Sequence, residues 1–330
     1  MTETRRTLPP YPSGWYALAF SAELARERLV VRPFVGRELV LFRTRSGRAC
    51  AMDAYCPHLG AHFGHGGTVE GEILRCPFHG FCFDPSGRCV ATGYATKPPP
   101  NACIETWPLR EVNGMLLVYH GADGTPSWEV PALDWSGWSV PFYRRFVLHA
   151  HPQETTENSV DLGHFAYVHG YRSVRMQRDV VTDGPYLSTA YTARRAAPLL
   201  GRLSPALEVD FEFETHIHGL GYSQVDVLVR GFDVRARMWV LPAPIDAERI
   251  SLYLAASGDG SADAAHAWLR PIPGRLRAAL IGRGLLAALA ADARQDFDIW
   301  QNKRYLHPPA LAQGDGPIGK YRTWATRFYQ

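Results

Sequence analysis

Four residues in the first third of the chain have the types and spacing of a metal site. Cys56-Pro-His58 and Cys76-Pro-Phe-His79 form two knuckles, each with one thiol and one imidazole, and seventeen residues separate them. Thiolates and imidazoles together bind either a structural zinc ion or an iron–sulfur cluster. The sequence therefore predicts an inorganic centre held between two short loops.

The two knuckles resemble those of a Rieske [2Fe–2S] centre, in which two cysteines hold one iron and two histidines hold the other. Gly60 and Gly80 follow the knuckles, and a glycine lets the backbone come close to a cluster. Zinc fingers pair cysteine with cysteine and histidine with histidine, so a structural zinc site is the less favoured alternative. The resemblance assigns four cluster ligands: Cys56, His58, Cys76 and His79.

The residues around the knuckles predict a low reduction potential. High-potential respiratory Rieske proteins carry an extra disulfide and hydroxyl groups that hydrogen-bond the sulfurs, and such donors stabilise the reduced cluster. The matching positions here carry no such groups: they are Ala61, Phe78, Phe81 and Phe83. His62 and His65, between the knuckles, are expected to be loop residues. The other cysteines are expected to be buried thiols: Cys50, Cys82, Cys89 and Cys103.

A second group of candidate residues lies about a hundred positions further along, in ENSVDLGHFAYVHG (157–170). Asp161 stands three residues before His164, so the two side chains share one face of a helix. His169 follows His164 by five residues, which places it off that face, where Gly170 is a suitable helix end. Two imidazoles and one carboxylate can hold Fe(II) and leave coordination positions open.

This motif resembles the mononuclear iron site of Rieske non-haem iron oxygenases, whose signature residues fall here on Asn158, Asp161, His164 and His169. The resemblance implies that both histidines bind iron together with a carboxylate from a late helix. That carboxylate is expected to be Asp296, three residues before Ile299-Trp300. Asp298 is the alternative ligand. Residues two apart on a helix point about 200° away from each other, so only one of the two carboxylates can face the iron.

The same resemblance gives roles to the remaining motif residues. Asp161 is implied to be an electron-transfer bridge between His164 and His79 of a neighbouring subunit, and not an iron ligand. Asn158 is expected either to contact the iron or to bond only backbone, and it is not assigned as a ligand. Glu157 has no assigned role and is expected to be solvated.

Composition limits the remaining possibilities. The 330 residues carry a net charge of +3 and no block of like charges, so nothing indicates nucleic-acid binding. The N-terminus has no apolar core after its arginines and does not resemble a signal peptide. No run reaches the ~18 apolar residues of a transmembrane helix, and 279–293 is expected to be a soluble helix. We expect a cytoplasmic protein.

The elements that position these residues follow from the hydrophobic pattern. Short strands and turns run from Trp15 to about Gly121, and Asn113-Gly114 between apolar runs predicts a hairpin. We expect a domain of residues 1–123 and a second of residues 124–330. The second begins with a strand at 143–151, has adjacent alternating runs at 207–219, 222–231, 232–242 and 249–257 that predict an antiparallel sheet, and turns helical from about Ala262 to Tyr305.

The resemblance to Rieske oxygenases extends over nearly the whole chain. Residues 298–329 resemble a narrower group, the 3-ketosteroid 9α-hydroxylase oxygenase component and the cholesterol 7-desaturase (Neverland-type) enzymes. The resemblance implies an α+β protein with an all-β Rieske domain, followed by a helix-grip (START-like) catalytic domain. It implies that the protein assembles as a homotrimer. It also implies a [2Fe–2S] cluster and a mononuclear Fe(II).

The implied activity is that of a terminal oxygenase component, a monooxygenase or dioxygenase. Electrons from NAD(P)H would arrive through a separate ferredoxin or flavin reductase, because the chain has no flavin or dinucleotide motif of its own. With O2 it would hydroxylate, desaturate or cyclise a bulky apolar molecule, steroid-like or from secondary metabolism. The alternatives are an oxygenase for a small aromatic substrate, a Rieske electron carrier, and a zinc-stabilised lipid-binding protein.

Overall fold

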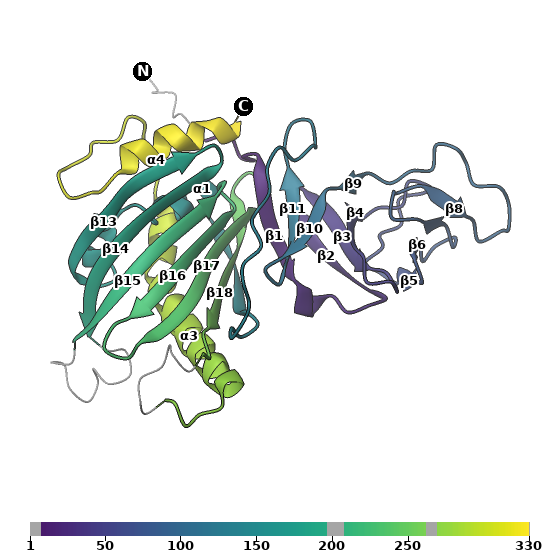
Figure 1. The fold of residues 1–330 in the computed structure, drawn as a ribbon. Helices are drawn as coiled ribbons and strands as arrows, with labels where there is room; N and C mark the ends of the chain where they lie inside the picture. The colour runs from purple at the N-terminus through teal and green to yellow at the C-terminus, as the bar shows by residue number, and fades with distance from the viewer. Residues whose placement is uncertain (1–7, 197–207, 262–268, 330) are drawn as a thin grey trace, which may run out of the picture. The chain divides into compact units, whose positions relative to one another are not determined.

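The computed structural model describes residues 8–196, 208–261 and 269–329, which fall into two compact units (Figure 1). One unit comprises Ser13–Ala132 together with Ala243–Ala247. The other comprises the residues before Ser13, Leu133–Pro242 and the chain from Glu248 onward. This division by packing places residues 124–132 with the N-terminal unit.

The N-terminal unit consists of three small antiparallel sheets, with strand orders β1-β11-β10, β2-β3-β4-β9 and β5-β6-β7-β8. A single 3-10 turn, η1 (Ser21–Glu23), follows the first strand. The strands are β1 (Gly14–Phe20), β2 (Arg28–Phe34), β3 (Arg37–Arg43), β4 (Ala49–Asp53), β5 (Thr68–Glu70), β6 (Ile73–Arg75), β7 (Cys82–Phe83), β8 (Cys89–Ala91), β9 (Thr106–Trp107), β10 (Leu109–Val112) and β11 (Met115–His120).

The hairpin predicted from Asn113-Gly114 is confirmed. Val112 pairs with Met115, and the two turn residues adopt φ values of 55° and 75°. Two successive positive φ values match the right-handed twist of the flanking strands, and Asn-Gly tolerates them best.

The second unit is built on one seven-stranded antiparallel sheet with the order β12-β18-β17-β16-β15-β14-β13. Its strands are β12 (Phe142–His149), β13 (Arg172–Asp183), β14 (Tyr186–Ala196), β15 (Glu208–His218), β16 (Tyr222–Val229), β17 (Val234–Pro244) and β18 (Arg249–Gly258). Its helices are α1 (Pro152–Glu157), α2 (Leu162–Tyr167), the long α3 (Gly274–Asn302), α4 (Ile318–Ala325) and the 3-10 turn η3 (Thr326–Tyr329). The expected α+β class, an all-β domain followed by a domain with a large antiparallel sheet, is confirmed.

Helix α3 lies across one face of this sheet (Figure 1). Leu286, Ala290 and Ala293 on the helix pack against Leu252 and Leu254 of β18. Glycine permits the close approach at one end: a Cβ on Gly258 would lie 2.4 Å from the carbonyl oxygen of Ala278. The packing fixes which face of α3 meets the sheet, and therefore where its later carboxylates point.

The structure corrects several sequence-based expectations. The late helix begins at Gly274 and not near Ala262; residues 262–268 lie outside the described part, and 269–273 are not helical. Strands β13 and β14 were not predicted.

The apolar run 279–293 lies within α3, and no helix among the described residues is long and apolar enough to cross a membrane.

Candidate metal centres

The two cysteine–histidine knuckles have the same backbone geometry. The N–H of Cys56 donates to the carbonyl of Ala61 at 2.8 Å, and the N–H of Cys76 donates to the carbonyl of Phe81 at 2.8 Å. In each loop the following glycine donates back to the cysteine carbonyl, and both glycines have positive φ, 74° at Gly60 and 65° at Gly80. The loops are therefore two copies of one turn, which present equivalent ligands toward each other.

Within this pair of turns the thiols are buried and the imidazoles are partly buried. Cys56 and Cys76 are 2% and 3% exposed and belong to the core of the unit. The rings of His58 and His79 lie 4.8 Å apart, and His58 stacks on Phe81. The two thiols are therefore more deeply buried than the two imidazoles.

Two observations test whether a [2Fe–2S] cluster fits here. Nδ1 of His79 is buried without a hydrogen-bond partner, and a metal bond would satisfy it. One zinc ion would hold its ligand atoms within about 4.6 Å of one another, twice the Zn–ligand distance. Among the described residues no three knuckle ligands come within 4.8 Å of one another. The set fits a two-metal cluster better than a single ion.

The surroundings of the knuckles agree with most expectations for the cysteines. All six cysteines are free thiols, and Cys50, Cys82 and Cys89 are buried. The expectation for Cys103 is wrong: it lies exposed on a loop beside an isolated bridge to Arg88. Burial raises the pKa of the Cys56 thiol to about 12, so a metal must displace its proton on binding.

The second candidate centre brings together residues more than a hundred positions apart. Ligand atoms of His164, His169 and Asp296 all lie within 4.8 Å of one another. Oδ1 of Asp296 is 2.7 Å from Nε2 of His164, and Oδ2 is 3.5 Å from Nε2 of His169. Asp296 is 4% exposed, whereas Asp298 is exposed. Two imidazoles and a buried carboxylate that converge in this way fit a mononuclear Fe(II) site.

Local helix geometry explains the five-residue spacing of the histidines. Asp161 is the N-cap of α2 and accepts the N–H of His164 at 3.0 Å. The helix ends at Tyr167, Gly170 has a φ of 67°, and the N–H of Tyr171 returns to the carbonyl of Phe165 at 3.0 Å. His169 therefore lies beyond the helix, in the turn that brings it back beside His164.

Polar neighbours orient the two imidazoles unequally. Nδ1 of His169 lies 3.2 Å from Oε1 of Gln295, so it donates there and leaves Nε2 free for a metal. Burial and the neighbouring His164 hold the pKa of His169 below its ordinary value, which favours the neutral ligand form. Nδ1 of His164 is buried without a partner. Asn158 places its amide nitrogen 3.3 Å from Nε2 of His164.

Asp161 meets His164 through the main chain. Its carboxylate caps the amide of His164, and no hydrogen bond joins it to the imidazole. Burial raises the pKa of this carboxyl, and the amide N–H opposes that shift. The cap thus fixes the Asp161 carboxylate at the N-terminus of α2, near His164.

The expectation that Glu157 is solvated is wrong. Glu157 is 6% exposed and forms two hydrogen bonds with Arg322 of α4, at 2.6 and 2.8 Å. Arg322 also lies over the ring of Tyr305, 4.5 Å from its centroid. This buried ion pair connects the end of α1 to α4.

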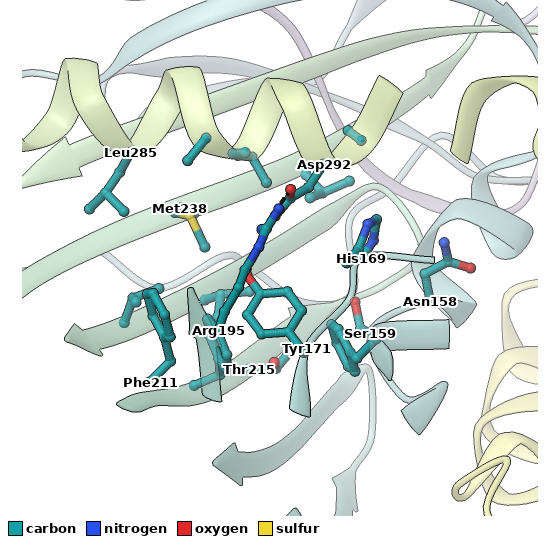
Figure 2. Close-up of a pocket in the computed structure, with 18 of the residues that line it drawn as sticks. Asn158, Ser159, His169, Tyr171, Arg195, Phe211, Thr215, Met238, Leu285 and Asp292 are labelled. Carbon is teal, nitrogen blue, oxygen red and sulfur yellow. Dashed lines mark hydrogen bonds and ion pairs between the residues drawn. The ribbon is translucent and has the colours of Figure 1, made fainter. Parts of the chain in front are cut away.

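A cavity of about 390 Å³ opens beside the mononuclear centre (Figure 2). His164, His169 and Asp296 form part of its wall. Much of the rest is apolar and comes from strands and α3: Val209, Phe211, Phe213, Val225, Val227, Val229, Phe232, Met238, Val240, Leu254, Leu285 and Leu289. A cavity of this size and lining is suited to an apolar molecule, next to the candidate iron ligands.

Sequence reasoning missed three groups at this site. Gln295 adjoins the predicted ligand Asp296 and could have been found from that position. Asp292 lies one helical turn before Asp296, which is also a readable signal. Arg195, which pairs with Asp292, comes from a strand that was not predicted.

Comparison with known protein families agrees with these two centres. Residues 14–108 match the Rieske [2Fe-2S] domain, and residues 118–329 match the 3-Ketosteroid 9alpha-hydroxylase C-terminal domain. This chain belongs to the Rieske oxygenases of the 3-ketosteroid 9α-hydroxylase type. As a Rieske oxygenase it is an oxidoreductase, with a Rieske [2Fe–2S] cluster and a mononuclear non-haem iron. The zinc-stabilised and electron-carrier alternatives are therefore set aside.

Several curated relatives and solved structures are similar to this chain over most of their own lengths. "Cholesterol 7-desaturase nvd 1" of Ciona intestinalis is 31% identical over 98% of this chain and 70% of the relative. The "Probable 3-ketosteroid-9-alpha-monooxygenase, oxygenase component" of Rhodococcus rhodochrous is 28% identical over 97% and 81%. Dicamba monooxygenase bound to dicamba has the same fold, with a TM-score of 0.67 at 18% identity over 96% of each chain. NdmA of Pseudomonas putida CBB5 with caffeine has a TM-score of 0.68 at 17% identity, covering 94% and 89%.

Proposed function

We propose that this chain is the terminal oxygenase component that oxidises a C–H bond of a bulky, largely apolar and steroid-like molecule. The observation that carries the proposal is the position of His164, His169 and Asp296 in the wall of an otherwise apolar cavity of about 390 Å³. That volume lies within the range of pockets that bury a drug-sized ligand. Relatives named for steroid and cholesterol oxidation support the substrate class.

In this proposal two separate groups of residues hold the cluster and the iron. Cys56, His58, Cys76 and His79 would hold the cluster, and His164, His169 and Asp296 would hold the iron. When bound, the mononuclear iron supplies O2-dependent oxidation of a neighbouring C–H bond. Gln295 fixes the His169 tautomer, and the apolar wall excludes water and orients the substrate.

Electron supply and assembly are also part of the proposal. A separate ferredoxin or flavin reductase would deliver electrons from NAD(P)H, as the words "oxygenase component" in a relative's name support. Asp161, which caps the main-chain N–H of His164, would couple the iron centre to His79 of a neighbouring subunit in a homotrimer. Outside the cluster ligands, Cys50, Cys82, Cys89 and Cys103 form no disulfide, which supports a reducing compartment such as the cytoplasm.

A second candidate function is oxidation of a small aromatic molecule. Dicamba monooxygenase and NdmA share the fold, and their structures contain dicamba or caffeine. The length of the apolar lining, from Leu285 to Asp296 along α3, favours the larger substrate.

The test is O2 uptake and product mass with a surrogate reductase and NADH, against a panel of polycycles and a panel of small aromatic acids. We expect polycycles to stimulate uptake, and a mass gain of one oxygen or a loss of two hydrogens distinguishes hydroxylation from desaturation. Turnover with small aromatics alone would replace the substrate proposal by the second candidate.

Matched variants test the third ligand in the same assay. Asp296→Ala should keep the Rieske absorption, lose mononuclear iron and lose turnover. Asp298→Ala, two residues away and exposed, should behave as the wild type. The reverse result would move the ligand assignment to Asp298.

A further inference from the structure

The apolar cavity contains one charged pair that does not belong to the metal centre. Nη1 of Arg195, on β14, donates to both carboxylate oxygens of Asp292, on α3, at 2.7 and 2.6 Å. The hydroxyl of Tyr171 donates to Oδ2 of Asp292 at 3.4 Å, and the guanidinium lies 5.0 Å from the centre of the Tyr171 ring. All three side chains line the cavity.

We propose that Arg195, held by Asp292 and Tyr171, binds a neutral oxygen of the substrate, a carbonyl or a hydroxyl. This inference rests on the proposed oxygenase function and specifies which apolar molecules the cavity accepts. It adds a recognition site to the reaction site at His164, His169 and Asp296.

The hydrogen-bond inventory of the trio identifies what it lacks. Asp292 accepts from Arg195 and from Tyr171, so each of its oxygens already has a hydrogen-bond donor. A guanidinium has five N–H donors; both hydrogen bonds of Arg195 to Asp292 come from Nη1, and the Tyr171 hydroxyl is its other side-chain neighbour. The side chain keeps 23% exposure and lines the cavity, so the donors on Nε and Nη2 are accessible to a ligand. The site therefore offers donors and needs an acceptor.

Charge selects the kind of acceptor. Asp292 already neutralises Arg195, so a carboxylate ligand would bring an uncompensated charge beside the pair, and that is costly in an apolar cavity. A carbonyl or hydroxyl oxygen accepts the same hydrogen bonds at no such cost. A pair retained only for packing would be easy to replace by apolar side chains.

The position along α3 sets where that oxygen lies in the substrate. Asp292 precedes Asp296 by four residues, one helical turn or about 6 Å along the axis. In Figure 2, Arg195 reaches from the sheet to Asp292, with His169 and Asn158 on one side and Leu285, Met238 and Phe211 on the other. The oxygen is thus placed about one turn from the carbon held beside Asp296, and the apolar body extends toward Leu285.

The main test measures binding, independently of turnover, by calorimetry on the enzyme with both centres loaded. The probes are a steroid 3-ketone, its 3-alcohol and its 3-deoxy hydrocarbon. We expect the wild type to bind the two oxygenated probes about 10- to 100-fold more tightly, the range of a hydrogen bond to a charged group. Arg195→Met combined with Asp292→Leu should bind all three probes alike, because it removes the donors without leaving an unpaired charge.

Two further variants keep the test decisive. Arg195→Lys retains the ion pair but replaces the planar five-donor guanidinium by one ammonium nitrogen with three donors, so it should weaken the preference even where the double variant does not fold. Arg194→Met combined with Asp210→Leu removes the neighbouring exposed pair, whose N–O distance is 2.6 Å, and should keep the preference.

The outcomes separate the two proposals. An unchanged preference in the double variant or in Arg195→Lys overturns the recognition site and leaves the oxygenase function standing. Failure of the wild type to bind any oxygenated polycycle overturns the proposed substrate class and the recognition site with it.

Discussion

Nδ1 of His169 lies 3.2 Å from Oε1 of Gln295, the residue immediately before the carboxylate that faces the same imidazole. One short stretch of α3 therefore both presents an acid to the candidate iron and fixes the tautomer of a histidine. A histidine whose Nδ1 donates to an amide oxygen has its Nε2 lone pair available for a metal.

The first prediction concerns this amide. Gln295→Leu removes the acceptor for His169, so we expect Fe(II) affinity to fall about 10- to 100-fold, the usual effect of losing a hydrogen bond behind a metal ligand. Anaerobic titration calorimetry with Fe(II) measures it. Gln301→Leu, exposed on the same helix, is the control. Equal Kd values for Gln295→Leu and the wild type would remove Gln295 from the site.

The second prediction separates two roles of Asp161. Asparagine caps helices about as well as aspartate, so Asp161→Asn should keep α2, the iron content and the Rieske absorption. Electron transfer in a single turnover should nevertheless slow by about 10- to 100-fold, because the charge beside His164 is lost. Asp161→Ala should add a stability loss of about 1 kcal/mol. Normal single-turnover rates in Asp161→Asn would leave the residue only its cap.

The third prediction uses the buried pair of Glu157 and Arg322. Arg322→Met leaves Glu157 buried without a partner, which should lower the free energy of unfolding by about 3–5 kcal/mol. Glu157→Leu combined with Arg322→Met should recover much of that loss. Urea denaturation measures both. Arg178→Met breaks an exposed pair with Glu214 and should cost no more than about 1 kcal/mol. A similar small loss in Arg322→Met would refute the argument.

The fourth prediction is a pH dependence of stability. Burial lowers the pKa of His151 to about 4, and burial together with His216 lowers that of His218 to about 4. Between pH 6.5 and 4 these two histidines therefore bind more protons in the unfolded chain than in the folded chain. The free energy of unfolding should therefore fall as the pH falls through this window, by at most about 1.4 kcal/mol per pH unit for each histidine.

His151→Asn tests this dependence without removing a helix cap. Nδ1 of His151 accepts the N–H of Gln153 at 3.1 Å, and an asparagine oxygen can replace it. Urea midpoints measured from pH 7.5 to 4.5 should fall less steeply in the variant. Parallel curves for the variant and the wild type would show that His151 titrates normally in the folded chain.

Local signals in the sequence predicted the parts of the fold that depend on neighbouring residues. Cys56-Pro-His58 and Cys76-Pro-Phe-His79 predicted two equivalent turns, and Asn113-Gly114 predicted a hairpin, because each is governed by a few backbone angles. Strands β13 and β14 escaped prediction because β13 is largely exposed and alternates poorly. Asp183-Gly184, between the two strands, was the signal available for their turn.

Long-range pairs account for the rest of what was missed. Nothing near Glu157 in the sequence indicates Arg322, 165 residues away, so a charged side chain next to a motif was expected to be solvated. Arg195 and Asp292 are 97 residues apart and meet only because α3 crosses the sheet. Asp296 was predicted from its resemblance to a family pattern, and its place beside both histidines depends on the same crossing.

The spacing of residues along helix α3 determines which carbon of an anchored substrate lies beside the candidate iron ligands. Ala288, Asp292 and Asp296 follow one another at four-residue intervals along the cavity wall. The distance between a substrate's anchoring oxygen and its reacting carbon therefore changes in steps of about 6 Å when the anchor moves from one of these positions to the next. Moving the anchor from residue 292 to residue 288, with a matching donor on the sheet, would shift the oxidised position by about 6 Å along the substrate. Divergent enzymes on this scaffold could thus change the site of attack by relocating one ion pair while the iron ligands stay fixed.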